Sequence, residues 1–269
     1  MTTDRAATTT LVLLSAVFAL FFLLPFAGLI DRAIEEGNTW ELARSETART
    51  ALWLSIWTST VTVALAIVFG TPVAYLLSRS SFPGKAIVDG LIDLPIVLPP
   101  TVAGVALLTA FGRRGLIGEP IEDWTGQSFA FTTTAVIMAQ LIVATPFYVR
   151  AARSGFDSVD RRIESVAYTL GASRTRTLFR VVLPQVRPAL LAGIGLCWAR
   201  SMGELGATLI FAGNLEGETQ TMPLAIIQAF EGSALGLAGA IALSLVLLAV
   251  ALVVLVLFRL VSARGTVQA

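Results

Sequence analysis

The chain has 269 residues, of which 55% are hydrophobic and only 14% charged, and its formal net charge is +1. Soluble proteins carry about 25% charged residues, whereas apolar runs of about 20 residues are typical of membrane-spanning helices. One cysteine, Cys197, and no histidine exclude an intramolecular disulfide, a Cys/His metal centre and a histidine proton relay. The near-neutral charge gives no indication of nucleic-acid binding. We therefore expect an all-α integral membrane protein.

Apolar segments predict six spans within a single transmembrane domain that covers residues 1–269. The expected spans are residues 11–30, 50–78, 87–111, 129–152, 187–211 and 237–260. The first is expected to be retained, because it is longer than a typical signal-peptide core and contains no small-residue cleavage site.

The distribution of lysine and arginine orients these spans. If the N-terminus is cytoplasmic, thirteen of these residues lie on the inside and five on the outside, namely Arg32, Arg44, Arg49, Arg113 and Arg114. This bias follows the positive-inside rule and predicts that both termini are cytoplasmic. The long polar loop 153–186 then also lies in the cytoplasm.

Consecutive prolines interrupt the third predicted span. Pro99 and Pro100 have no backbone N–H, so the carbonyls of Pro95 and Ile96 lose their helical partners. Irregular backbone at membrane depth is tolerated inside protein or along a water-filled cavity. A packed kink and a cavity lining are both compatible with the pattern, and Thr101 would let a neighbour or solute approach closely.

The fifth predicted span combines small residues with an ionisable pair. Gly203 and Gly206 favour close helix packing or space for a pathway, and Thr208 adds a neutral donor. Arg200 and Glu204 lie one turn apart. Ionisable residues inside a membrane are functional candidates, but these two can also form a structural ion pair. Both interpretations remain open.

The loop before this span, residues 153–186, contains apolar residues at regular spacing. Apolar residues repeat at helical spacing, and Gly171 suits the left-handed position after a helix end. The face consists of Ile163, Val166, Ala167 and Leu170. A second short helix is expected over about 174–182, ended by Leu183–Pro184. The unit resembles a docking element, and the alternative is an amphipathic loop lying on lipid.

The loop is similar to the cytoplasmic "EAA" loop of permease subunits in binding-protein-dependent ABC importers. Gly171, nine residues, Val181, one residue and Leu183–Pro184 match that pattern. The family triplet falls on residues 165–167, where Ser replaces Glu and Val replaces Ala, and Glu164 lies one position early. The resemblance implies that the loop seats in a partner ATPase through Glu164, Ser165, Val166, Ala167, Gly171, Ala172 and Ser173.

Longer motifs resemble molybdate/tungstate ABC permeases over about residues 50–230. They are DLPIVLPPTVAG, FGRRG, TPFYVRAARSGFDSVD, ARSMGELGATLIFAGN and TQTMPLAI, in that order. Sulfate/thiosulfate permeases share the coupling loop and a Gly-Glu-x-Gly-Ala segment and are the nearest alternative. The resemblance implies a homodimer with two ATPase subunits, an external oxyanion-binding protein and a path between the third and fifth spans. Its path or gate residues would be Pro99, Pro100, Thr101, Gly203, Glu204, Gly206 and Thr208.

The chain has no Gly-x-x-x-x-Gly-Lys-Ser/Thr phosphate loop, so we expect ATP hydrolysis by a separate subunit. ATP and magnesium would be bound there, and no cofactor or metal by this chain. Two other classes are a stand-alone ion-coupled transporter and an intramembrane enzyme. No chain of carboxylates or histidines crosses the spans and no repeated half is clear, which argues against the former. No candidate general base lies near Cys197 or Ser201 in the sequence, which argues against an intramembrane enzyme.

Overall fold

The computed structural model describes residues 2–232 and 234–266, and every regular element within them is a helix. The long helices are α1 (Thr2–Glu36), α3 (Glu46–Arg79), α7 (Thr133–Ser158), α10 (Leu183–Met202) and α13 (Gly236–Thr266). The shorter ones are α2 (Thr39–Leu42), α4 (Lys85–Val97), α5 (Pro100–Phe111), α6 (Gly118–Thr125), α8 (Arg161–Thr169), α9 (Arg174–Thr177), the π-helical turn η1 (Leu178–Val182), α11 (Gly206–Ala212) and α12 (Met222–Phe230).

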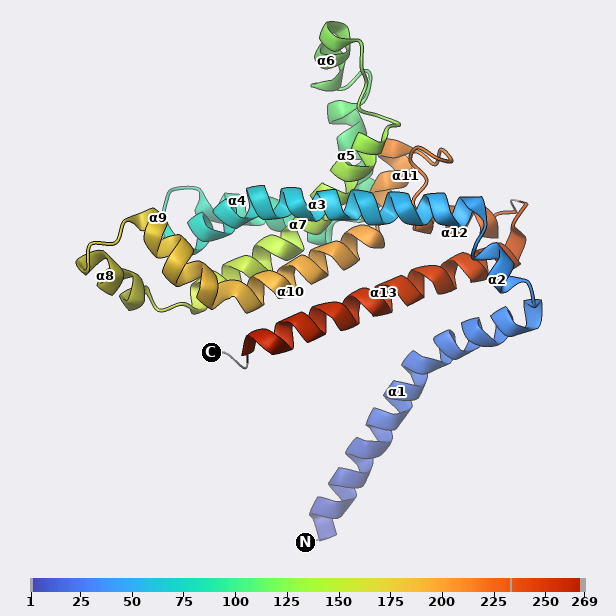
Figure 1. Cartoon of the computed structure of the whole chain (residues 1–269), viewed down its shortest axis with the longest axis horizontal. Coiled ribbons are helices and arrows are strands. Elements are labelled where there is room, and N and C mark those ends of the chain that lie inside the picture. The colour runs from blue at the N-terminus through green and yellow to red at the C-terminus, as the bar shows by residue number, and fades with distance from the viewer. Residues whose placement is uncertain (1, 233, 267–269) are drawn as a thin grey trace.

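Helices α3, α7, α10 and α13 form a bundle and run along its long axis (Figure 1). Glycines let them approach closely. A Cβ at Gly193 on α10 would lie 2.9 Å from the Ala151 side chain on α7, and one at Gly70 on α3 would lie 3.0 Å from Val149. Close contact through small residues is the usual way in which helices pack in a membrane, because moving apolar surface from lipid to protein gains little free energy. Helices α8 and α9 lie at one end of the bundle, and α2 and α12 at the other (Figure 1).

Polar side chains also join α3 to α7 inside the bundle. The Gln140 amide on α7 donates to the Thr58 hydroxyl at 3.1 Å and accepts from the Thr62 hydroxyl at 3.0 Å. All three residues are buried. Because each polar group finds a partner, this cluster fixes the register of α3 against α7 without leaving an amide unsatisfied.

Among the described residues, five helices are long and apolar enough to cross a membrane, and the bent pair α4–α5 is a sixth candidate. The apolar stretch of α1 has none of its residues buried, and the helix runs away from the bundle (Figure 1). This helix is therefore peripheral in the chain, and its apolar surface is free to face lipid. α7 continues to Ser158, so the first residues of the predicted loop 153–186 are helical.

The expected third span is not one straight helix. α4 and α5 meet at an angle of 117° and are separated by Leu98 and Pro99, both with extended backbone. The two prolines cause this break, because they remove two successive helical hydrogen bonds and Pro disfavours helical geometry in the residue before it. As a result α5, followed by α6, projects sideways from the bundle (Figure 1).

The fifth predicted span, 187–211, is also interrupted. α10 ends at Met202, and α11 begins only at Gly206.

At the N-terminal end of α10, the predicted stop at Leu183–Pro184 does not occur, because the chain remains helical from Arg174 through the π-helical turn into α10. Pro184 occupies the first turn of α10, and the side-chain amide of Gln185 donates to the Val181 carbonyl at 2.9 Å. A wider π turn before the proline, and its place in the first turn of α10, therefore accommodate it.

Candidate functional site

Local hydrogen bonds define both ends of α8. The Asp160 side chain accepts from the Arg162 backbone N–H at 2.9 Å, which caps the N-terminus. At the other end Gly171 has φ of +82°, and the N–H of Ala172 donates to the Ala167 carbonyl at 3.0 Å. With the bond from the Gly171 N–H to the Tyr168 carbonyl, this is a Schellman motif. The helix and its glycine turn therefore form where the sequence predicted them.

One face of α8 presents uncovered apolar side chains. Ile163, Val166 and Leu170 are 40%, 59% and 82% exposed, and they lie at the end of the bundle. Ser165 and Ser173 are also exposed, whereas Ala167 and Ala172 are half-buried. An apolar face left open on a helix held rigidly at both ends is a suitable surface for a partner protein.

The opposite face of α8 is fixed to the bundle by charge. Glu164 is only 7% exposed, and its carboxylate lies 2.7 Å from the guanidinium of Arg79 at the end of α3. Arg79 also donates to the Val159 carbonyl at 3.2 Å, and Arg161 donates to the Ser78 carbonyl at 2.9 Å. Glu164 thus lies on the inner side of α8, away from the exposed apolar face, although the sequence grouped it with the coupling residues.

Sequence reasoning missed Arg79 as part of this site, having counted it only as a cytoplasmic charge. No local signal could have found it, because the sequence does not show that Glu164 is buried and Arg79 lies far from it in the chain.

The two helix breaks lie against each other. A Cβ at Gly206 would lie 3.2 Å from the Pro100 side chain and from the Thr101 backbone nitrogen. One turn on, a Cβ at Gly104 would lie 2.9 Å from the backbone of Ala207. The structure therefore brings together predicted path residues from the third and fifth segments, at the start of α5 and the start of α11.

Glu204 and Arg200 form an ion pair, with 2.8 Å between their side chains. Glu204 is 1% exposed, and its other oxygen accepts from the Ala207 N–H at 2.9 Å. The carboxylate therefore caps the first turn of α11 while it neutralises Arg200. These contacts account for the glutamate as a structural group of the break.

The remaining predicted path residues differ in exposure. Pro99, Thr101 and Gly203 are exposed, whereas Thr208 is fully buried. Within the part of the chain that the structure describes, the Thr208 hydroxyl has no hydrogen-bond partner. Pro99, Thr101 and Gly203 therefore lie at the surface of this chain, and Thr208 is enclosed within it.

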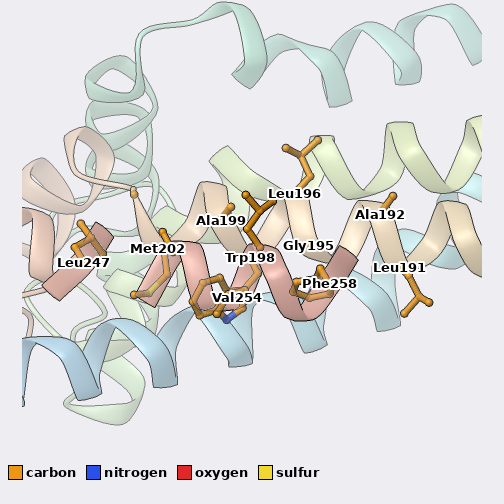
Figure 2. A pocket seen from close by; sticks show the side chains of 13 residues that line it. Leu191, Ala192, Gly195, Leu196, Trp198, Ala199, Met202, Leu247, Val254 and Phe258 are labelled. Carbon is orange, nitrogen blue, oxygen red and sulfur yellow. The ribbon is translucent and has the colours of Figure 1, made fainter. Parts of the chain in front are cut away.

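A cavity of about 600 Å³ lies between α10 and α13 (Figure 2). Its lining side chains are apolar, with Trp198 the largest, and it extends along α10 from Leu191 to Gly203. An oxyanion needs hydrogen-bond donors or water in place of its hydration shell. This cavity is therefore a poor passage for an anion, and the helix breaks are the better candidates.

Ion pairs also hold α4 against α7. Arg150 contacts Asp93 through two hydrogen bonds of 2.7 and 2.8 Å, and Arg153 contacts Asp89 at 2.5 Å. No residue of α4 is buried. The helix that leads into the first break is thus attached by these ion pairs and by Ile92, which packs against the core, without a fully buried residue.

Comparison with known proteins adds to this geometry. The family described as "Binding-protein-dependent transport system inner membrane component" matches residues 66–266. The molybdenum transport system permease protein ModB of Escherichia coli K12 is 41% identical over 77% of this chain and 90% of its own length. A probable sulfate transport system permease protein, cysT of Chlorokybus atmophyticus, is 36% identical over 79% of this chain and 75% of its own.

The fold is also similar to a solved structure. A chain in the crystal structure of a bacterial alginate ABC transporter in complex with alginate pentasaccharide-bound periplasmic protein has a TM-score of 0.70. The match covers 96% of this chain and 93% of that one, at 16% sequence identity. This likeness concerns the fold alone.

Proposed function

Because the chain belongs to the family of binding-protein-dependent transport system inner membrane components and is a multi-pass membrane protein, we propose that it is the permease of an ATP-driven oxyanion importer. In this proposal two copies form a homodimer with cytoplasmic termini. An external binding protein delivers molybdate or tungstate, and two ATPase subunits bind to the cytoplasmic side. ATP and magnesium are bound by those subunits, and this chain binds no cofactor.

The similarity to ModB supports molybdate as the substrate class, since it extends over nine-tenths of that protein. Sulfate is the second candidate, because the relative named for sulfate transport matches 79% of this chain, although at a lower identity of 36%. Both substrates are tetrahedral dianions that lose hydration free energy in hydrocarbon, so either needs a passage with water or polar donors. The non-helical backbone beside Pro99, Thr101 and Gly203 is such a location.

The observation that carries the coupling mechanism is the two-sided contact of α8. Its outer face leaves Val166 and Leu170 uncovered, while its inner face is tied to α3 through Glu164 and Arg79. A partner that binds the outer face and moves therefore moves α3 as well. We infer that ATP-driven closure of the ATPase pair uses α8 as a lever and opens the path outward by alternating access.

The test is ATPase activity of the reconstituted complex, with and without loaded binding protein, for Gly171→Pro. The residue has positive φ, which proline cannot adopt, so the Schellman motif should be lost. Stimulation by the binding protein should fall by at least about tenfold in a complex that still assembles. Gly126→Pro is the matched control, because Gly126 has φ of +71° and ends α6, away from α8. Unchanged stimulation in Gly171→Pro would refute the lever.

The substrate is tested in the same vesicles with the wild-type chain. Molybdate and tungstate should each stimulate ATP hydrolysis and accumulate inside at micromolar concentration, and sulfate should not. Uptake of sulfate with no uptake of molybdate would assign the chain to the second candidate.

A further inference from the structure

A second cavity, of about 490 Å³, lies where α3, α8 and α9 meet, behind the coupling helix. Its walls differ from those of the apolar cavity between α10 and α13. Three arginines, Arg79, Arg161 and Arg174, line it together with a single carboxylate, that of Glu164. The charged groups around this space therefore leave an excess of positive charge.

The excess resides on two of the arginines. Glu164 pairs with Arg79, so this pair is neutral. Arg161 makes one hydrogen bond, to the neutral carbonyl of Ser78. The side chain of Arg174 makes no ion pair or hydrogen bond among the residues that the structure describes. Two guanidinium groups on the wall of one cavity thus have no counter-ion.

Hydroxyl donors complete the wall. Tyr168 and Thr175 both line the cavity, and neither hydroxyl is engaged in a hydrogen bond within the described part of the chain. Guanidinium forks and hydroxyls are the groups that proteins use to hold phosphate-like oxyanions, because each anion oxygen accepts several short, charge-assisted bonds.

We propose that this cavity binds a phosphate-class anion, held by Arg161 and Arg174 with Tyr168 and Thr175 as further donors. The source is either a free oxyanion in the cytoplasm or the headgroup of an anionic phospholipid. The ligand would connect α8, which carries Arg161, to α9, which carries Arg174, across the glycine turn. Its binding would stiffen the coupling helix on the side that faces the bundle.

The first arm of the test measures the free anion. Full-length protein in non-ionic detergent, stripped of lipid, is titrated with sodium phosphate at constant ionic strength and followed by calorimetry. Arg174→Gln should weaken binding by at least about tenfold, since it removes a charge-assisted contact. Arg176→Gln is the matched control, because Arg176 lies two residues further on, is exposed and does not line the cavity.

The second arm measures the lipid. Native mass spectrometry of protein exchanged into mixed phosphatidylglycerol and phosphatidylcholine should show retained phosphatidylglycerol in the wild type and in Arg176→Gln, and its loss in Arg174→Gln. Saturable phosphate binding identifies the free anion as the source, and retention of phosphatidylglycerol alone identifies the headgroup. If neither ligand binds, or if both glutamine variants weaken binding equally, the site does not exist.

Discussion

The two ends of the proposed coupling pathway are held together by different forces. At one end α8 is attached by polar contacts, chiefly Glu164 with Arg79 and Arg161 with a backbone carbonyl. At the helix breaks α5 and α11 meet through Gly104 and Gly206, where backbone contacts backbone. Polar contacts can be exchanged one at a time, whereas close packing is either formed or lost.

The difference suggests how a small movement becomes a large one. In the proposed mechanism α8 transmits force through a few directional contacts and tilts without disrupting a packed core. In this proposal α5 and α11 are either packed or separated, because the contacts at Gly104 and Gly206 are lost when the two backbones move slightly apart. Substitutions that change charge should therefore have their main effect at α8, and substitutions that change side-chain volume should have theirs where α5 meets α11.

Removing the carboxylate at the lever end should have the largest effect. Glu164→Leu leaves the guanidinium of Arg79 nearly buried without a counter-ion, which costs about 3 kcal/mol. If that cost appears as detachment of α8, amide hydrogen exchange in residues 161–170 should rise about a hundredfold while exchange in α7 is unchanged.

Two variants control this experiment. Ser165→Ala, at an exposed neighbouring position, should leave exchange near wild type. The double variant Glu164→Leu with Arg79→Met removes both charges and should recover most of the loss. Equal exchange in Glu164→Leu and Ser165→Ala would mean that the ion pair does not hold α8.

A change of volume at the breaks should have the next largest effect. In Gly104→Val the new Cβ would lie 2.9 Å from the Ala207 backbone, which cannot move without shifting α11. Overpacking of this kind costs about 1–3 kcal/mol, so the thermal midpoint of the solubilised protein should fall. Gly203→Ala should be nearly neutral, because its Cβ would have only the Ala199 carbonyl oxygen nearby, at 3.6 Å. Equal midpoints for the two variants would contradict close packing at the breaks.

Much of this arrangement could be predicted from local chemistry. The cap of α8, the left-handed Gly171 and the interruption at Pro99 and Pro100 follow from rules that involve only neighbouring residues. The interaction of Arg200 with Glu204 was also within reach, since the spacing allows an ion pair.

Other features depend on contacts between distant segments. The stop expected at Pro184 failed, because a π-helical turn lets the helix continue, and no local pattern indicates such a turn. At the 117° angle between α4 and α5, Gly104 lies against Ala207 and Gly206 against Pro100, and these contacts join segments far apart in the sequence. The inward direction of Glu164 depends on Arg79, which lies 85 residues earlier in the chain.

Helix α4 lies between the charge-held region at α8 and the packed breaks at α5 and α11. Substitutions in it should have the smallest effect on stability, and they test where the charge-held region ends. It is attached to α7 by Asp89 with Arg153 and by Asp93 with Arg150, yet it leads directly into the break before α5. A double-mutant cycle with Asp89→Asn and Arg153→Gln should give a coupling energy of about 0.5–1 kcal/mol in thermal unfolding, because both groups are partly solvated. That coupling should shrink in high salt, as expected of a screened pair. If it is absent at low salt while Gly104→Val still destabilises the protein, α4 is positioned by the packed break, and the charge-held region ends at α8.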